Sequence, residues 1–159
     1  AMVSEVRSGD STCREAAAAR LYFQVLFGDG FSRDSDCSVN AALNYGYAII
    51  LSAVSREIVS RGFQTPLGIC HRSEFNQFNL SCDLMEPFRP IVDRLVFDNV
   101  GSDFTREDKR LLVDSLNNTI AYRGGSYRVS STISLYVQDC LSALCRKLSV
   151  DEIEPFDIV

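Results

Sequence analysis

Residues 38–61 constrain the fold more than any other part of this chain. Apolar side chains recur there at steps of three and four, which is the period of an α-helix. The first apolar face consists of Val39, Leu43, Tyr47, Ile50, Val54 and Ile58. A second face consists of Ala42, Gly46, Ile49 and Ala53. A helix that is apolar on two faces is buried on most sides, so we expect one long central helix with shorter helices packed around it.

Shorter segments on both sides of this helix also have helical patterns. The sequence Thr12-Cys13-Arg14-Glu15 fits a capping box and predicts a helix that ends near Gly28. Further helices are expected from about 81 to 100 (with Pro87 and Pro90 disturbing its first turns), from 105 to about 118, and from 131 to 148. A small hairpin is expected around Gly124-Gly125. The predicted fold class is therefore mainly α: a multi-helix domain with a small β-hairpin.

Length and composition indicate one globular domain. The chain has 159 residues, of which 46% are hydrophobic and 23% charged, as in ordinary globular proteins. The longest apolar stretch, residues 48–54, is too short to cross a bilayer, and we expect no membrane association. A net charge of −5 argues mildly against a dedicated nucleic-acid binder, although acidic cation sites contribute to it and another domain could carry a basic surface.

The two ends of the chain differ from its middle. No signal peptide opens the sequence, and Ala1-Met2 suggests that residues 1–8 are a linker or a remnant of cloning attached to a fragment of a longer protein. Residues 9–150 contain the helical patterns, and residues 151–159 form an acidic tail that we expect to be loosely held. Six cysteines without a CxxC pair fit a reducing compartment, hence a cytoplasmic location.

The chain contains one histidine, His71, and this excludes several chemistries. HExxH zinc proteases and facial-triad iron enzymes need two histidines. The GxSxG elbow, the P-loop and the GxGxxG fingerprint are absent from the sequence. Cys70 and Cys82 could join His71 in a zinc site, but no paired cysteine spacing supports it. Mixed histidine and carboxylate coordination of a hard divalent cation, Mg²⁺ or Mn²⁺, is the most economical chemistry that remains.

Candidate ligands for such a cation lie close to His71 in the sequence. Asp83 and Glu86 are three residues apart and share one face of the expected helix. His71 lies in the irregular segment just before that helix. A further ligand has to come from another helix, and Glu15 is the candidate.

Three motifs in order resemble a known family. They read REAAAARLYFQVLFG (14–28), NAALNYGYAIILSAVSREIVSRG (40–62) and LGICHRSEFNQFNLSCDLMEPFRPIVD (67–93). Together they resemble the α-helical catalytic domain of the CRISPR-associated integrase of spacer acquisition, most closely its type II form. The likeness is strong from about residue 9 to 97 and looser beyond. It implies that residues 9–150 are this catalytic domain and that the metal is held by Glu15, His71 and Glu86, where many relatives have aspartate at the last position.

The resemblance also implies an activity and partners. The activity is phosphoryl transfer on DNA: a 3′-hydroxyl of spacer DNA attacks a phosphodiester of the CRISPR repeat, with Mg²⁺ or Mn²⁺ as cofactor, in prokaryotic antiviral adaptation. The expected partners are double-stranded DNA, a second copy of the full-length protein, a small bridging adaptation protein and other type II adaptation proteins. The family's N-terminal β-rich domain, which mediates the dimer, is not expected in this chain. Asp83 and Asn79 are expected to support the ligands, and the expected DNA-binding residues are Arg20, Arg72, Asn76 and Arg89.

Each assigned residue also has an ordinary structural interpretation. Glu15 could complete the cap at Thr12, and Glu86 could pair with Arg89 at the surface. A single histidine beside a helix start is often structural, and asparagines such as Asn79 often hold loops. The alternative function is therefore an isolated helical scaffold that binds DNA or partner proteins without turnover.

Overall fold

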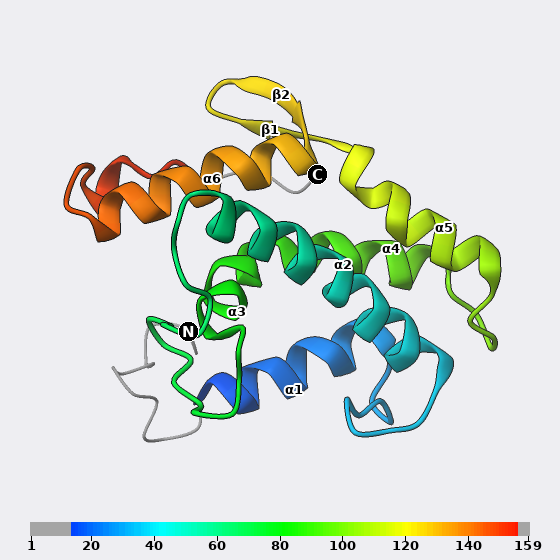
Figure 1. The fold of residues 1–159 in the computed structure, drawn as a ribbon. Helices are drawn as coiled ribbons and strands as arrows, with labels where there is room; N and C mark the ends of the chain where they lie inside the picture. The colour runs from blue at the N-terminus through cyan, green and yellow to red at the C-terminus, as the bar shows by residue number, and fades with distance from the viewer. Residues whose placement is uncertain (1–13, 156–159) are drawn as a thin grey trace.

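The computed structural model describes residues 14–155, except for the side chains of Arg14 and Glu15 (Figure 1). The α-helices are α1 (Arg14–Phe27), α2 (Ser38–Ser60), α3 (Asn79–Met85), α4 (Arg89–Asn99), α5 (Arg106–Asp114) and α6 (Val129–Leu144). Single 3₁₀ turns are η2 (Glu86–Phe88), η3 (Ser115–Asn117) and η4 (Val150–Glu152), and the strands are β1 (Thr119–Tyr122) and β2 (Gly125–Arg128). The prediction of a mainly α domain with one small hairpin is confirmed.

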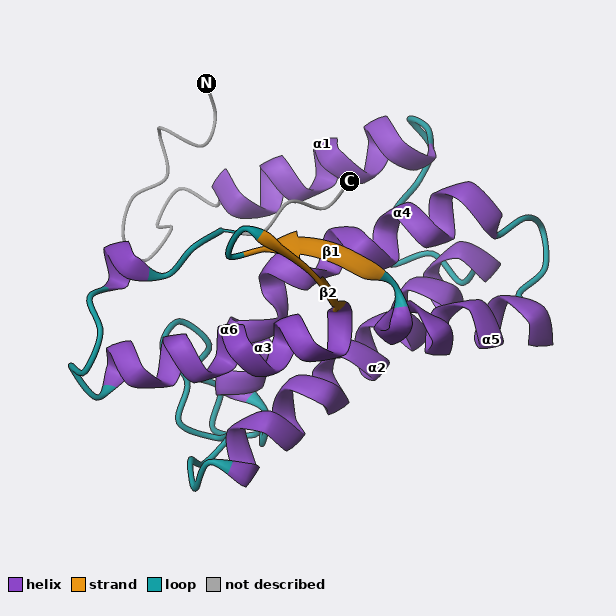
Figure 2. Ribbon diagram, turned by 90° about the horizontal axis from the view of Figure 1, so that it is seen from above, coloured by secondary structure: helices purple, strands orange, loops and turns teal. Residues whose placement is uncertain are grey.

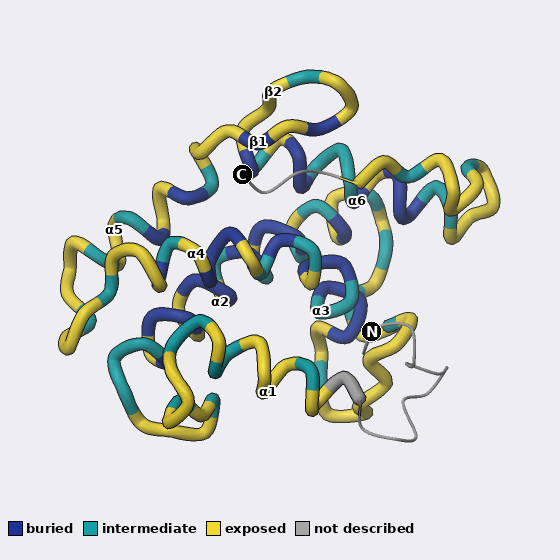
Figure 3. Tube along the Cα trace, turned by 180° about the vertical axis from the view of Figure 1, so that it is seen from behind, coloured by how far each residue is buried: buried dark blue, intermediate teal, exposed yellow. Residues whose placement is uncertain are grey.

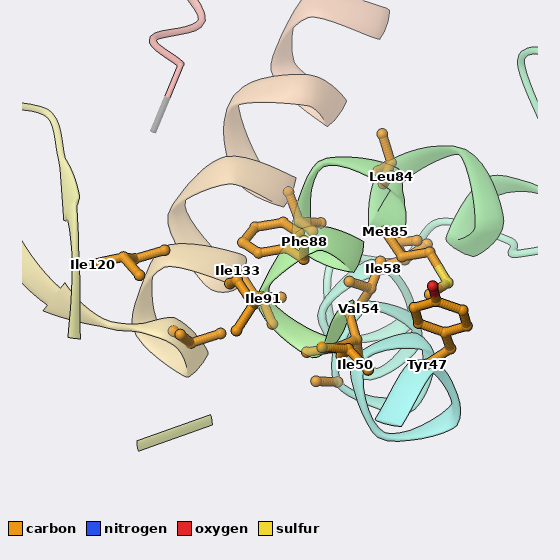
Figure 4. Packing of buried hydrophobic residues seen from close by; sticks show 14 of the residues in the cluster. Tyr47, Ile50, Val54, Ile58, Leu84, Met85, Phe88, Ile91, Ile120 and Ile133 are labelled. Atoms are coloured by element: carbon orange, nitrogen blue, oxygen red, sulfur yellow. The ribbon is translucent and has the colours of Figure 1, made fainter. Parts of the chain in front are cut away.

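Helix α2 is the centre of the domain, as its two apolar faces predict. It packs against α3, α4, α5 and α6, and of its ten predicted apolar positions all but Val39 and Ile49 are buried. Figure 4 shows side chains from α2 meeting those of the α3–α4 region and Ile133 of α6. Burial of this apolar surface, at roughly 25 cal/mol per Å², is the main stabilising contribution to such a helical domain.

Gly46 allows this close packing. A Cβ added at Gly46 would lie 2.4 Å from Cγ1 of Val92 in α4 and 3.3 Å from Cδ2 of Leu112 in α5. Both partner side chains are fully buried. The glycine therefore lets two helices approach the backbone of α2 at the same point.

The helix predicted from residue 81 begins earlier and is divided in two. Helix α3 starts at Asn79, and the 3₁₀ turn η2 separates it from α4. Pro87 and Pro90 are the second residues of η2 and α4, respectively, within the first turn of each. A proline has no N–H for the helical ladder but fits a first turn, which explains why the chain restarts its helix here.

The C-terminal half confirms two further local predictions with small shifts. Thr105 and Asp108 form a capping box that starts α5. The hairpin pairs Ile120 with Tyr127, but its turn residues are Arg123 and Gly124, both with positive φ. The turn therefore lies one residue earlier than predicted. Figure 2 shows the hairpin beside the start of α6, which both strands contact.

The last helix was predicted too far toward the C-terminus. It ends at Leu144, and Arg146 has the left-handed φ of 57° that breaks the helical path. As a result Leu144 is half exposed rather than buried. The first part of the acidic tail is ordered, since Ser149 and Glu152 form a capping box around η4 and Ile153 packs against the core.

No helix within the described residues is both long enough and apolar enough to span a bilayer.

Candidate functional site

The segment between α2 and α3 presents His71, and the side chain of Asp83 in α3 holds it in place. Asp83 accepts hydrogen bonds from the backbone N–H groups of Ile69, Cys70 (3.1 Å) and His71 (3.0 Å). Nδ1 of the His71 ring lies 2.7 Å from Oδ1 of the same carboxylate. One acidic side chain therefore fixes both the loop backbone and the orientation of the imidazole.

The electrostatics of Asp83 define which ring nitrogen is available. Burial alone would raise the pKa of Asp83, but the hydrogen bonds from the His71 side chain and the three N–H groups outweigh it and lower this pKa. The ionised carboxylate only accepts hydrogen bonds, so Nδ1 of His71 donates. In the neutral ring Nε2 then carries the lone pair, and 44% of the His71 side chain is exposed to solvent. Carboxylate–histidine pairs of this kind are typical of metal-binding histidines.

Two asparagines stabilise the same loop. Nδ2 of the buried Asn79 donates to the carbonyls of Pro66 (3.1 Å) and Ser73 (2.8 Å). Asn76 accepts a hydrogen bond from the N–H of Phe78 at 2.9 Å. Gly68 allows the loop to lie flat on α3, because a Cβ there would be 2.7 Å from that of Asn79. Both asparagines hold the loop in this structure, and the DNA contact expected of Asn76 stays a prediction.

Glu86 lies in η2 and pairs with a neighbouring arginine. Its Oε1 is 3.2 Å from Nη2 of Arg89, and 45% of the Glu86 side chain is exposed. The Arg89 guanidinium also lies over the ring of Tyr47, 4.8 Å from its centroid. Nε of Arg89 is buried without a hydrogen-bond partner among the described residues. The arginine predicted to contact DNA is thus engaged within the domain, and its role with DNA stays a prediction.

A buried carboxylate attaches α1, the helix that carries Glu15, to the rest of the domain. Asp93 of α4 is 3% exposed and accepts hydrogen bonds from the hydroxyls of Tyr22 in α1 (2.9 Å) and Tyr47 in α2. Burial raises the pKa of Asp93, although both tyrosines and the nearby Arg89 and Arg33 oppose this. Burial next to Asp93 also raises the pKa of both tyrosines.

This attachment was not predicted from the sequence. Its members are separated by up to 71 residues, and a lone aspartate within a helix has no distinctive local pattern. Tyr47 packs in the core, as its position on the apolar face of α2 predicts. Tyr45 is partly exposed, and the centroid of its ring lies 5.7 Å from that of Phe104.

A pocket of about 450 Å³ lies between α1 and the loop that follows it. Arg20 lines this pocket together with Phe23, Phe31 and Arg33. Figure 3 shows that α1 is mostly exposed or half-buried along its length. Arg20 is therefore accessible, as its expected contact with DNA requires. Arg72 is also exposed and uses Nε to bond the carbonyl of Ile69 at 3.2 Å.

The structure brings together only part of the predicted site. His71 and Asp83 are in contact, and Glu86 is paired with Arg89. The side chain of Glu15 is outside the described residues. Within the described part of the chain, no three His, Cys, Asp or Glu side chains form a group that could hold a metal. The zinc alternative of Cys70, His71 and Cys82 is therefore not formed.

Comparison with known proteins identifies relatives of this chain. The model of the family described as CRISPR associated protein Cas1 matches residues 12–115. The CRISPR-associated endonuclease Cas1 of Neisseria meningitidis serogroup C (strain 8013) is 38% identical over 97% of this chain and 54% of its own length. A CRISPR-associated endonuclease Cas1 of Francisella tularensis subsp. novicida (strain U112) is 36% identical over 77% of this chain and 45% of its own length.

Among solved structures, a casposase bound to integration product has a TM-score of 0.74 with 23% identity. The match covers 96% of this chain and 55% of the casposase chain, and at this identity it shows a shared fold. The chain spans about half the length of these relatives. The family model covers the part of the chain that contains Glu15, His71 and Glu86, and this chain belongs to the CRISPR-associated protein Cas1 family.

Proposed function

We propose that this chain is the catalytic helical part of a Cas1 endonuclease and integrase that inserts spacer DNA into a CRISPR array. The reaction is phosphoryl transfer, in which a 3′-hydroxyl attacks a repeat phosphodiester; with water as nucleophile the same site nicks DNA. Family membership supports this proposal, since the Neisseria and Francisella relatives are endonucleases by name. The related casposase was solved bound to integration product, which supports DNA as the substrate.

The observation that carries the proposal is the contact between Asp83 and His71. A largely buried carboxylate makes four hydrogen bonds to one short loop, and the side chain of the single histidine, whose Nε2 does not face Asp83, is 44% exposed. A purely structural histidine gains nothing from an exposed Nε2, whereas a metal ligand requires it. The donor set of Glu15, His71 and Glu86 fits a hard divalent cation that tolerates one imidazole, Mg²⁺ or Mn²⁺.

The chain's own residues would have distinct roles at this site. His71 would bind through Nε2 with Asp83 fixing its ring, and Glu15 and Glu86 would add carboxylate oxygens. The Glu86 side chain is 45% exposed, so it could leave Arg89 to bind the ion. The Arg89 guanidinium would keep its contact with the Tyr47 ring. A divalent ion held there would neutralise the charge that develops on the phosphate. Arg20 and Arg72 would hold DNA phosphates beside the site.

Thermal unfolding with and without Mn²⁺ and cleavage of a branched duplex together test the proposal. Wild type should show metal-induced stabilisation and metal-dependent cleavage. His71→Ala and Glu15→Ala should lose both, whereas Glu107→Gln, an exposed acid in the first turn of α5, should keep both. Cleavage that continues unchanged in Glu15→Ala would contradict the catalytic proposal.

The ion pair between Glu86 and Arg89 favours the second candidate, a scaffold that binds DNA or partners without turnover. In that case Glu86→Gln would lose the pair to Arg89 and cost little stability, because exposed pairs contribute well under about 1 kcal/mol. The same variant would leave DNA affinity and the Mn²⁺ response unchanged. Loss of the Mn²⁺ response in Glu86→Gln would instead support the metal site.

A further inference from the structure

Arg89 contacts the candidate ligand Glu86 and the ring of Tyr47 at the same time. Nη2 of its guanidinium lies 3.2 Å from Oε1 of Glu86, and its Cζ lies 4.8 Å from the centroid of the Tyr47 ring. Glu86 begins η2 and Arg89 begins α4, so three residues of continuous chain keep the two charged groups together. A carboxylate expected to bind a divalent cation is therefore paired with a cation of the protein itself.

The ion pair between Glu86 and Arg89 is easily exchanged. The Glu86 side chain is 45% exposed and that of Arg89 is 38% exposed, and water and salt weaken pairs of this kind. A second pair on the same helix is closer, since Nε of Arg94 donates to Oδ2 of Asp98 at 2.7 Å. Nε of Arg89 is buried without a hydrogen-bond partner among the described residues, so this nitrogen does not hold the guanidinium toward Glu86.

The position of Arg89 does not depend on Glu86 alone. An aromatic ring holds a guanidinium by its face and leaves the N–H groups at its edge free for other partners. The Tyr47 ring is itself fixed, because its hydroxyl donates to the buried Asp93. Burial raises the pKa of Asp93, and the nearby charge of Arg89 is among the influences that oppose this rise. Tyr47 and Asp93 therefore keep Arg89 in place when Glu86 leaves.

A divalent cation and Arg89 compete for the carboxylate of Glu86. If both bind it at once, two positive groups lie a few ångströms apart and repel each other. A phosphate at the edge of the guanidinium removes this repulsion, and the planar fork of arginine suits phosphate oxygens. After such an exchange every charge is paired, with Glu86 on the cation and Arg89 on the phosphate.

We propose that Arg89 is a positioning residue that weakens the binding of a cation by Glu86 until a DNA phosphate replaces Glu86 on the guanidinium. Cation and DNA then bind cooperatively, and each raises the affinity for the other by the same factor. This inference rests on the proposed function, since it assumes that Glu86 is a ligand and that DNA reaches Arg89. It also explains why an arginine expected to bind DNA pairs with Glu86 in this structure.

The affinity of the whole chain for Mn²⁺ without DNA is the first test, measured from the electron paramagnetic resonance signal of free Mn²⁺. Arg89→Gln should bind Mn²⁺ about fivefold more tightly than wild type, because Glu86 loses its competing partner and the repulsion disappears. Arg89→Lys keeps the positive charge and should stay close to wild type. Arg94→Gln removes an equal charge from the same helix, where it pairs with Asp98, and should have no effect.

The affinity for a fluorescent branched duplex is the reciprocal test. Ca²⁺, used in place of Mn²⁺ to limit cleavage, should strengthen DNA binding by wild type at constant ionic strength. This gain should be about fivefold smaller in Arg89→Gln and unchanged in Arg94→Gln, because coupling between two ligands is mutual. An arginine that only binds phosphate would instead lower DNA affinity by the same factor with and without Ca²⁺, and that result would overturn the proposal.

The sign of the change in Mn²⁺ affinity separates this inference from the proposed function. Weaker or unchanged Mn²⁺ binding by Arg89→Gln would overturn the inference alone, because wild type would still bind the metal. Arg89→Met keeps an apolar contact with the Tyr47 ring and should show the same increase, so it replaces Arg89→Gln if that variant does not fold. Absence of Mn²⁺ binding in wild type and in every Arg89 variant would contradict the catalytic proposal and this inference with it.

Discussion

Oδ1 of Asp83 lies 2.7 Å from Nδ1 of His71, and the same carboxylate accepts the N–H groups of three consecutive loop residues. The side chain of Asp83 is only 7% exposed. It bonds the backbone N–H groups of the loop, which in a helix or strand would be bonded by backbone carbonyls. The position of the histidine therefore depends on α3 rather than on the residues beside it in sequence.

Asp83→Ala should loosen this loop more than it destabilises the domain. Residues 69–71 are exposed, so their N–H groups can bond water once the carboxylate is removed, and we expect a loss of about 1–2 kcal/mol in the free energy of unfolding. Amide hydrogen exchange should accelerate strongly at residues 69–71, while α2 stays protected. Asp83→Asn should have a smaller effect, because an amide oxygen still accepts hydrogen bonds. Unchanged exchange at these three amides in Asp83→Ala would contradict this role.

Tyr22→Phe should weaken the attachment of α1. It removes the 2.9 Å hydrogen bond to buried Asp93 and keeps the ring, so the free energy of unfolding should fall by about 1–2 kcal/mol. The Mn²⁺ response should also weaken, since α1 carries Glu15. Tyr45→Phe is the matched control, because Tyr45 contacts Phe104 through its ring, and chemical denaturation should show no change. If both variants lose equal stability, the hydroxyl of Tyr22 has no specific role.

The pH dependence of stability should contain a contribution from Asp93. Tyr22, Tyr47, Arg33 and Arg89 face this group, and its pKa is raised because burial dominates. The folded state then holds a proton that the unfolded state has released, so this contribution to stability is full below the unfolded pKa of about 4 and is lost as pH rises through the folded pKa.

Asp93→Asn should remove this contribution. Denaturation curves measured between about pH 3 and pH 8 should show that the difference in stability between wild type and Asp93→Asn changes in favour of the variant as pH rises. A difference that is constant with pH would show that Asp93 has the same pKa in both states.

Gly46→Ala should destabilise the core despite the higher helix propensity of alanine. The new methyl would lie 2.4 Å from Val92, and overpacking of this kind costs typically 1–3 kcal/mol. Val92→Ala in the same chain should restore part of the loss by making room. Gly101→Ala, where a Cβ meets nothing within 4 Å, should be neutral. A stability gain in Gly46→Ala would show that α4 and α5 move apart easily.

The sequence was most informative where structure is local. The period of apolar residues located α2 to within one residue at its C-terminal end, since Ser60 rather than Arg61 ends it. The Thr105 cap and the hairpin follow from short-range rules. The end of α6 was missed because the left-handed Arg146 has no glycine or asparagine signal, and the start of α3 was missed because Asn79 serves the loop as well as the helix.

The candidate site was predictable by resemblance more than by pattern. Glu15, His71 and Glu86 were selected through family motifs, and their convergence remains a prediction. The contact of His71 with Asp83 was expected in general terms, since Asp83 was assigned a supporting role. The three backbone bonds of Asp83 and the attachment of Tyr22 to Asp93 depend on tertiary packing between segments that are far apart in sequence, for which single residues give no signal.

Anomalous diffraction from crystals of this chain soaked in Mn²⁺ tests the central claim most directly. We predict one strong peak within coordination distance of Nε2 of His71, with carboxylate oxygens of Glu15 and Glu86 also bound to it and Glu86 turned away from Arg89. A well-ordered map with Glu86 still paired to Arg89 and no peak at His71 would contradict the account.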